Sequence, residues 1–286
     1  MRFIFRVLGG LILILVIIAS YITIWGTQDI RTAIAIESPQ PEKARALLQQ
    51  MAEAHGVSNW DGIETYSVEL EDLFFGQLGN YSHPFPEDTV QFLLTYIPNS
   101  FDGRMQFLSG EKNGLVWGMQ SWKTYYNSQS KGFKFEENNG IKFWLPTYQY
   151  FIEFPKRILN ADALAYAGEK EINGKLCDGV IATWKSTAPQ IDIDQYLIWI
   201  DRSTHRIAKL EYTIREAYNF LKGAAYFNDY KNYQGIYLPS SLPVESNLLQ
   251  DGLLHEMKIS NFTKNPISQK ELRPNLALKI LGDEKK

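Results

Sequence analysis

The chain has 286 residues, of which 45% are hydrophobic and 14% aromatic, and its formal net charge is −3. This slightly acidic balance offers no basic field for nucleic acid, so we expect no nucleic-acid partner. The single cysteine, Cys177, excludes an intramolecular disulfide and a cysteine zinc cluster. The folded part must therefore be stabilised by its core, and 16 Tyr, 16 Phe and 7 Trp can supply one.

The N-terminus contains a long uncharged stretch. Nineteen residues from Val7 to Trp25 carry no charge, and as a helix they would extend roughly 28 Å, close to the thickness of a bilayer core. Arg2 and Arg6 precede the stretch and Asp29 follows it, which favours a cytoplasmic N-terminus. We predict a single-pass signal-anchor in a bacterial inner membrane, made by residues 1–27, with the main domain in the periplasm.

A cleaved signal peptide is the alternative to an anchor. The "AIA" at Ala33–Ala35 has the composition of a cleavage site, but it follows Asp29 and Arg31 and so lies far downstream of the apolar run. We expect residues 28–40 to form a linker and residues 41–286 to form one domain.

The segment Pro41–His55 has the pattern of an amphipathic helix. Pro41 suits a first helical position, and Gly56 suits the residue after a C-terminus. The apolar positions fall on one stripe, so we expect this helix to pack one face on a sheet.

After His55 the apolar period changes to two, which is typical of strands. Asn173-Gly174 and Gln234-Gly235 each interrupt two such runs and predict tight hairpins, and "GEKNG" predicts a longer one. We count about ten or eleven strands, most joined to the next by short turns. The sequence therefore predicts a mainly β protein, a half-open antiparallel barrel with filling or lid helices.

The aromatic segment Trp144–Leu159 interrupts the strands. Tyr148 and Phe151 share a helical stripe, and Pro155 should kink or end such a helix. This short helix is either ordinary core or a lid over the open side of the curved sheet.

No residue pattern identifies a catalytic or metal site. Asp201 and His205 lie in the turn of "YLIWIDRSTHRIAKLEY", where an Asp suits an Asx turn. We predict a structural corner, because a catalytic Asp and His need a third group and a pocket. The histidines share no metal spacing, so no metal and no cofactor is expected. A hydrolase assembled from His83 with Glu87 or Asp88 is the least favoured function.

The order of these features resembles the periplasmic lipoprotein-carrier superfamily (LolA/LolB-like). The similar parts are "ALLQQMAEAHG", "YAGEKEINGKLCDGVIATW", "YLIWIDRSTHRIAKLEY" and "FNDYKNYQGIYLPSSLPVE", within residues 42–265. The resemblance implies a half-open antiparallel barrel whose open side is filled by helices and whose cavity holds acyl chains. The membrane span departs from the family pattern and makes a shuttle between membranes doubtful.

We therefore expect a tethered periplasmic protein that binds lipid, lipoprotein acyl chains or another apolar ligand. The alternative is a structural or sensory envelope protein that acts through protein contacts, with an unknown partner. In either case the Val7–Trp25 helix would contact the membrane. The predicted cavity lining comes from the apolar strand faces and the lid: Tyr66, Val68, Leu70, Phe92, Leu94, Trp117, Trp184, Tyr148 and Phe151.

Overall fold

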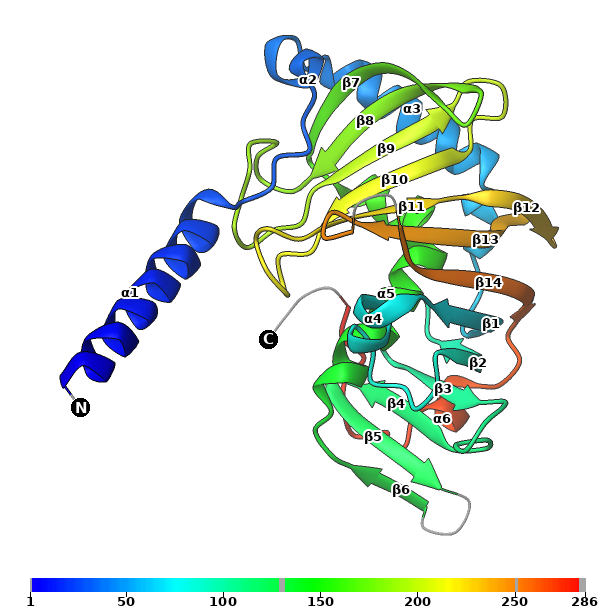
Figure 1. Ribbon diagram of the computed structural model, residues 1–286. Coiled ribbons are helices and arrows are strands. Elements are labelled where there is room, and N and C mark those ends of the chain that lie inside the picture. Colours follow the sequence, from blue (N-terminus) through cyan, green and yellow to red (C-terminus); the bar gives the residue numbers. More distant parts are fainter. Residues whose placement is uncertain (1, 129–131, 250–251, 283–286) are drawn as a thin grey trace.

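The computed structural model describes residues 2–128, 132–249 and 252–282, without the side chains of residues 2–6 and 22–25. Within these residues, one antiparallel sheet of 14 strands runs through the molecule in the order β6-β5-β4-β3-β2-β1-β14-β13-β11-β10-β9-β8-β7, and β12 pairs with β13 (Figure 1). Most neighbouring strands are also neighbours in sequence, as expected for short turns. The pairing of β1 with β14 brings together the two ends of the folded part of the chain.

The bounds of the strands are β1 Tyr66–Phe74, β2 Thr89–Tyr96, β3 Gly103–Phe107, β4 Val116–Gln120, β5 Lys123–Ser128, β6 Gly132–Phe135, β7 Ala163–Ile172, β8 Lys175–Thr183, β9 Tyr196–Asp201, β10 Ile207–Thr213, β11 Lys222–Tyr226, β12 Asn228–Tyr233, β13 Ile236–Ser246 and β14 Leu253–Lys264. The helices are α1 Arg2–Trp25, α2 Ala33–Glu37, α3 Pro41–Ala54, α4 Gly76–Tyr81, α5 Asn139–Arg157 and α6 Gln269–Leu272, with 3₁₀ turns η1 Val57–Trp60 and η2 Ile158–Asn160.

The mainly β, antiparallel architecture is confirmed, but the predicted count of ten or eleven strands was too low. The sheet is not closed into a barrel: β6 and β7 are the ends of the strand order. The strands β5 and β6 were not predicted, and the residues of β6 are all exposed and give no alternation to detect. The run before the predicted Gln234-Gly235 hairpin forms two strands, β11 and β12, which are separated at Phe227, and β12 pairs with β13.

Of the two predicted helices, α3 has the expected bounds and α5 does not. Helix α3 runs from Pro41 to Ala54 with His55 as its C-cap, as predicted. Helix α5 is longer than expected, because it begins at Asn139, and it continues through Pro146 and Pro155 to Arg157. Each proline removes one backbone hydrogen bond, and burial of the apolar face of α5 offsets this loss. The predicted linker 28–40 contains the short helix α2.

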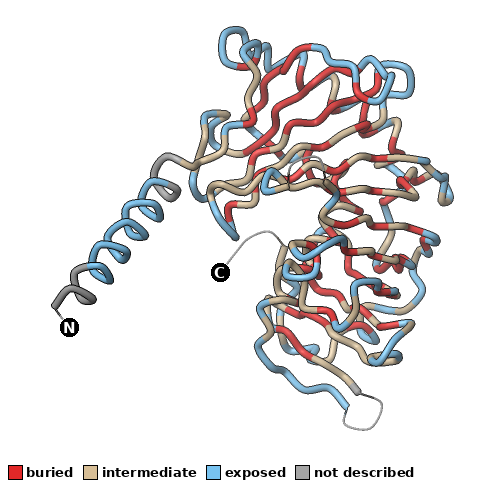
Figure 2. Tube along the Cα trace, viewed as in Figure 1, coloured by how far each residue is buried: buried red, intermediate tan, exposed pale blue. Residues whose placement is uncertain are grey.

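The main core lies between the inner face of the sheet and the helices α3 and α5. Leu48 and Met51 of α3 and Leu145, Tyr148 and Phe154 of α5 are almost completely buried against residues from both halves of the sheet. In the burial view, buried residues run almost without a break along β8 and β9, and they alternate with more exposed residues along β13 and β14 (Figure 2). The inner face is therefore a packed layer of side chains between sheet and helices.

The outer face of the sheet is covered near both ends. Near β7, the helix α2 and Ile30 cover a second cluster that includes Leu197 and Trp199 of β9 and the free Cys177 of β8. Because α2 and Ile30 cover the outer face here, both faces of β8 and β9 are buried. This burial explains why the sequences of the two strands are nearly continuous apolar runs.

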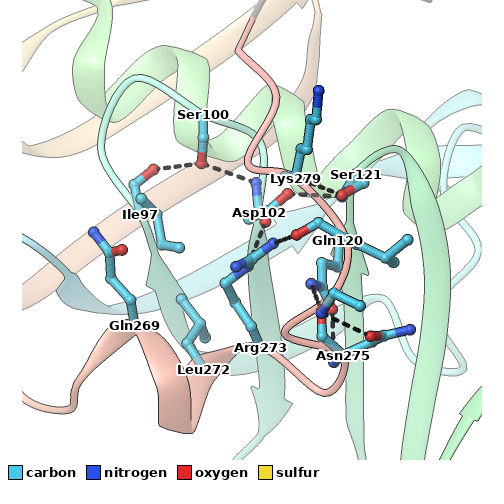
Figure 3. A network of polar contacts seen from close by, with 12 residues as sticks. Ile97, Ser100, Asp102, Gln120, Ser121, Gln269, Leu272, Arg273, Asn275 and Lys279 are labelled. Atoms are coloured by element: carbon cyan, nitrogen blue, oxygen red, sulfur yellow. Dashed lines mark hydrogen bonds and ion pairs between the residues drawn. The ribbon is translucent and has the colours of Figure 1, made fainter.

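Near β6, a C-terminal strap, residues 268–279, crosses the outer side of β3, β4 and β5 (Figure 3). Arg273 of the strap donates from Nε to the Oδ2 of Asp102 at 3.1 Å, and the Oδ1 of Asp102 accepts the N–H of Ser121 at 2.7 Å. Gln120 and Asn275 exchange two hydrogen bonds, of 2.5 and 3.1 Å. The strap is thus fastened to the start of β3 and to the β4–β5 turn.

The helix α1 extends away from the sheet (Figure 1). Its apolar side chains from Val7 to Ile18, and Tyr21, are about half exposed or more. Across the residues whose side chains the structure describes, no helix is both long and apolar enough to cross a membrane. The predicted span from Val7 to Trp25 therefore stays a prediction.

Candidate functional site

The candidate site is the inner face of the sheet together with the helix α5 that covers it. Asn138 begins α5 by accepting the N–H of Ile141 with its side chain, at 3.1 Å. Lys156 and Arg157 in the last turn complement the helix dipole. One face of α5 is apolar and aromatic, so the helix lies along the inner face of the sheet with its apolar side against the strands.

Glu153 is the main polar anchor of α5. Its side chain is completely buried and pairs with Arg157, Nε to Oε2 at 2.9 Å. It also accepts from the hydroxyl of Tyr66 on β1 at 2.8 Å, from the side-chain amide of Gln149 at 2.7 Å and from the N–H of Asn99 at 3.1 Å. Burial, and next the adjacent Glu153, raise the pKa of Tyr66 well above its usual value, so the phenol stays protonated and donates. These bonds connect the helix to the sheet at a fixed point.

A second polar anchor lies one and a half turns earlier on α5. The hydroxyl of Tyr148 donates to the Oδ2 of Asp72 at 2.7 Å, and the Oδ1 of Asp72 contacts the Nδ1 of His255 at 2.8 Å. All three residues are buried. Burial, and next the charge of Asp72, raise the pKa of Tyr148 well above its ordinary value, so this phenol also remains a donor.

The structure brings the nine residues of the predicted cavity together in one cluster. The fully or almost fully buried members are Tyr66, Val68, Leu70, Phe92, Leu94 and Tyr148. The other three, Trp117, Phe151 and Trp184, are half buried and pack against the same cluster. Whether these side chains line a ligand cavity stays a prediction.

Half-buried aromatic residues gather where α5 meets β9 and β10. Phe151 meets Tyr212 edge to face with ring centres 5.4 Å apart, and Tyr150 stacks on Tyr196 at 5.7 Å. Trp184 contacts the same Tyr196 at 6.4 Å. We call these five residues the aromatic seam. Tyr196 and Tyr212 were missed as site residues, although their alternation in "YLIWIDRSTHRIAKLEY" places them on the inner face.

Two open depressions lie elsewhere, on the outer side of the sheet. One, of about 420 Å³, lies between α2 and β7, β9 and β10, over Trp199. The other, of about 460 Å³, lies over β1, β2 and β14 and is bordered by Glu69, Glu71 and Lys258. Of the nine residues predicted to line the cavity, Leu70 and Phe92 border the second depression, and none borders the first.

The corner after β9 has the predicted structural form. The Oδ1 of Asp201 accepts the N–H and the hydroxyl of Ser203, at 2.8 and 2.7 Å, and its Oδ2 accepts the hydroxyl of Thr204 at 3.1 Å. His205, with a φ of 55°, is at the exposed tip of the turn. Asp201 and His205 therefore do not form a catalytic pair.

His83, Glu87 and Asp88, the residues of the hydrolase alternative, each interact with a different partner. His83 stacks on Phe74 with ring centres 3.8 Å apart, and burial lowers the pKa of its imidazole. Glu87 accepts the N–H of Glu111, and Asp88 accepts the side-chain amide of Asn80. In the part of the chain that the structure describes, no group of three or more potential metal ligands converges.

Comparison with known proteins identifies the fold. No family model matches the chain, and no curated protein matches it. Three solved structures are similar over nearly their whole length. A DUF1329 family protein from Desulfovibrio piger has a TM-score of 0.55 and 13% identity, over 85% of this chain and 100% of that one.

The other two structures have names that match the predicted resemblance. A putative outer membrane lipoprotein-sorting protein domain from Vibrio parahaemolyticus has a TM-score of 0.53 and 12% identity, over 83% of this chain and 99% of that one. A LolA superfamily protein from Nitrosomonas europaea has a TM-score of 0.52 and 12% identity, over 80% and 97%. The predicted resemblance is thus confirmed at the level of the fold: this chain has a LolA/LolB-like fold.

Proposed function

We propose that this protein binds an apolar ligand bearing an acyl chain, between α5 and the inner face of the sheet. The observation that carries the proposal is the aromatic seam. Aromatic side chains that are only half buried, and that meet across a helix and two strands, form a surface that an acyl chain can enter at modest cost. The fold agrees with this proposal, because it resembles those of a LolA superfamily protein and a lipoprotein-sorting domain.

Binding requires α5 to act as a lid. Tyr66 and Phe92 of the sheet are fully buried, and so is Tyr148 of α5, so a ligand has to displace part of the helix from the sheet. Pro146 and Pro155 each remove one hydrogen bond within α5, which makes these the points where the helix deforms at least cost. We infer that the predicted cavity, whose lining includes Tyr66 and Trp184, is formed when the lid moves.

The polar groups on the inner face favour binding over catalysis. Glu153 is engaged by Tyr66 and Arg157, and Asp72 by Tyr148 and His255. Groups paired in this way hold a helix in place and present no free nucleophile or base to a substrate.

The test is binding of a fluorescent fatty acid to purified Gln28–Lys286. We expect saturable binding that Phe151→Glu abolishes, because the new carboxylate would lie unpaired against the aromatic seam. The control is Phe133→Glu, since Phe133 is 46% exposed on the edge strand β6 and lies outside the seam. Both variants should keep the strand signal in circular dichroism. Absence of probe binding by the unmodified protein would refute the proposal.

The second candidate is a structural or sensory envelope protein that acts through protein contacts. The buried hydrogen bonds of Glu153 and Asp72 favour it, because they stabilise α5 as a permanent plug. The same titration separates the two functions, since a plug leaves no room for the probe.

Tethering to a membrane through α1 is a separate part of the proposal. It is supported by the uncharged sequence from Val7 to Trp25 and by the exposed apolar side chains along this helix. A reporter fused after Lys286 should be active only outside the cytoplasmic membrane. Activity in the cytoplasm would contradict the proposed periplasmic location of the main domain.

A further inference from the structure

The chain enters the sheet domain at a fixed point very close to the end of α1. The helix ends at Trp25. The N–H of Gln28 donates to the carbonyl of Asn219 at 3.0 Å, and the carbonyl of Gln28 accepts from Nη2 of Arg215 at 2.6 Å. Because three residues of extended chain cover at most about 10 Å, the loop that holds Gln28 cannot lie far from the end of α1.

The loop that holds Gln28 is the β10–β11 loop, and it is hydrogen-bonded to two neighbouring loops. The Oδ1 of Asp194, before β9, accepts the N–H of Arg215 at 2.7 Å. Asn247, after β13, accepts the N–H of Lys222 at 2.8 Å and donates to the carbonyl of Phe220 at 2.7 Å. The loops β8–β9, β10–β11 and β13–β14 are therefore joined at one end of the sheet, the side nearest α1 in Figure 1.

Each of these three loops exposes one large apolar side chain. Ile191 is 60% exposed, Tyr218 is 62% exposed and Leu248 is 50% exposed. The ring of Tyr218 stacks on Phe220 with centres 5.2 Å apart. Exposed aromatic and aliphatic side chains gathered at the exit of an apolar helix have the composition of a membrane-interface contact.

The charges near these side chains do not form a basic patch. Among the described residues of these loops, one basic residue, Lys185, is exposed together with the acidic Asp192 and Glu216, while Arg215 is buried. An electrostatic contact with anionic lipid would need a cluster of exposed Lys and Arg. A contact through this surface would therefore depend on the apolar side chains.

We propose that Ile191, Tyr218, Phe220 and Leu248 form a membrane-contact rim that rests in the headgroup region of the bilayer that α1 enters. The inference rests on the proposed tethering by α1. The short connection to Gln28 then holds the domain in one orientation, with the β10–β11 loop at the membrane and the opposite end of the strands, including the β9–β10 corner, away from it.

The experiment uses the full chain in vesicles of neutral phosphatidylcholine with brominated acyl chains, and a polarity-sensitive fluorophore on a single cysteine. Ala217→Cys places the label on the rim, beside Tyr218, at an exposed position. Glu171→Cys is the control, since it is exposed near the β7–β8 turn at the other end of the strands. The native Cys177 is buried, and burial raises its pKa to about 11, so the unmodified chain serves as the labelling blank.

We expect several-fold stronger quenching of the label at position 217 than at position 171, and equal quenching in neutral and anionic vesicles. The double variant Tyr218→Ser with Leu248→Ser should reduce the quenching at position 217 while the chain still floats with the vesicles. Flotation with no quenching at position 217 would overturn the rim and leave the tether in place. A chain that does not float would overturn the tether and with it the rim, and quenching only in anionic vesicles would overturn the apolar contact.

Discussion

The buried His55 should make the stability of the fold depend on pH above the range where carboxylates titrate. His55 caps α3, where its Nε2 accepts the N–H of Ile207 at 3.2 Å and its Nδ1 lies 3.3 Å from the carbonyl of Tyr237. The neutral imidazole fits both partners, because it carries one acceptor and one donor nitrogen. Burial lowers the pKa of His55 from 6.5 to about 3, against a smaller effect of the Tyr237 carbonyl that raises it.

The sign of the effect follows from where the proton binds. The unfolded chain takes up a proton near pH 6.5 and the folded chain only near pH 3, so acidification favours unfolding. The contribution is fully present above pH 6.5 and is lost progressively as the pH falls toward 3. Between about pH 7.5 and about pH 5, the linkage relation gives a loss of about 2 kcal/mol in the free energy of unfolding.

The assay is urea denaturation followed by tryptophan fluorescence at the two pH values, with His55→Gln as the perturbation. Glutamine can still donate and accept but does not titrate, so the variant should be less stable near pH 7.5 and should lose about 2 kcal/mol less on acidification. His83→Gln is the control for the other histidine whose pKa burial lowers. Equal losses in the wild type and His55→Gln would refute the reasoning.

Three substitutions test the polar anchors and the corner. Glu153→Gln should cost about 3 to 5 kcal/mol in urea denaturation, because the buried Arg157 would lose its counter-charge, whereas Glu136→Gln at the exposed pair with Lys134 should leave the stability almost unchanged. Arg273→Met should cost about 3 kcal/mol by leaving the buried Asp102 without its cation, and an unchanged midpoint would show that the strap is not fastened there. Asp201→Asn should lower the melting temperature only modestly, since an Asx acceptor remains; loss of probe binding at an unchanged melting temperature would contradict the structural role of Asp201.

Local patterns predicted the features that depend on neighbouring residues. The Asn173-Gly174 turn has φ values of 49° and 76°, as a tight hairpin with two left-handed residues requires. Helix α3 was predicted to within one residue, because proline, glycine and an apolar stripe mark its ends and its face. The strand β6 lacks such a signal, since its residues bury neither face.

Long-range partners could not be predicted from the sequence. Alternation places Tyr66 on the inner face of β1, but nothing in the pattern indicates that its hydroxyl meets Glu153, which is 87 residues away. The strap is a similar case, since the pairing of Asp102 with Arg273 spans 171 residues. A pattern specifies which face a side chain occupies, while the partner depends on which elements the completed fold brings together.

The elements that cover the two faces of the sheet determine how the lid α5 could open. The outer face is covered near its two ends, by α2 over an apolar cluster and by the strap through polar contacts. The middle strands β1 and β14 instead alternate buried and more exposed residues, with Glu69 and Lys258 on the outer side. On the inner face, Phe92 and Tyr148 are buried in the core between the sheet and α5, so movement of α5 without a ligand would expose them to water. Opening and binding are therefore coupled. The apparent affinity for an acyl chain is lower than the affinity of the open state, because the lid is open in only a small fraction of the molecules.

Substitutions that loosen the Glu153 anchor without filling the seam should then raise the apparent affinity for an acyl chain while lowering stability. If α5 is a permanent plug, the same substitutions would lower stability alone.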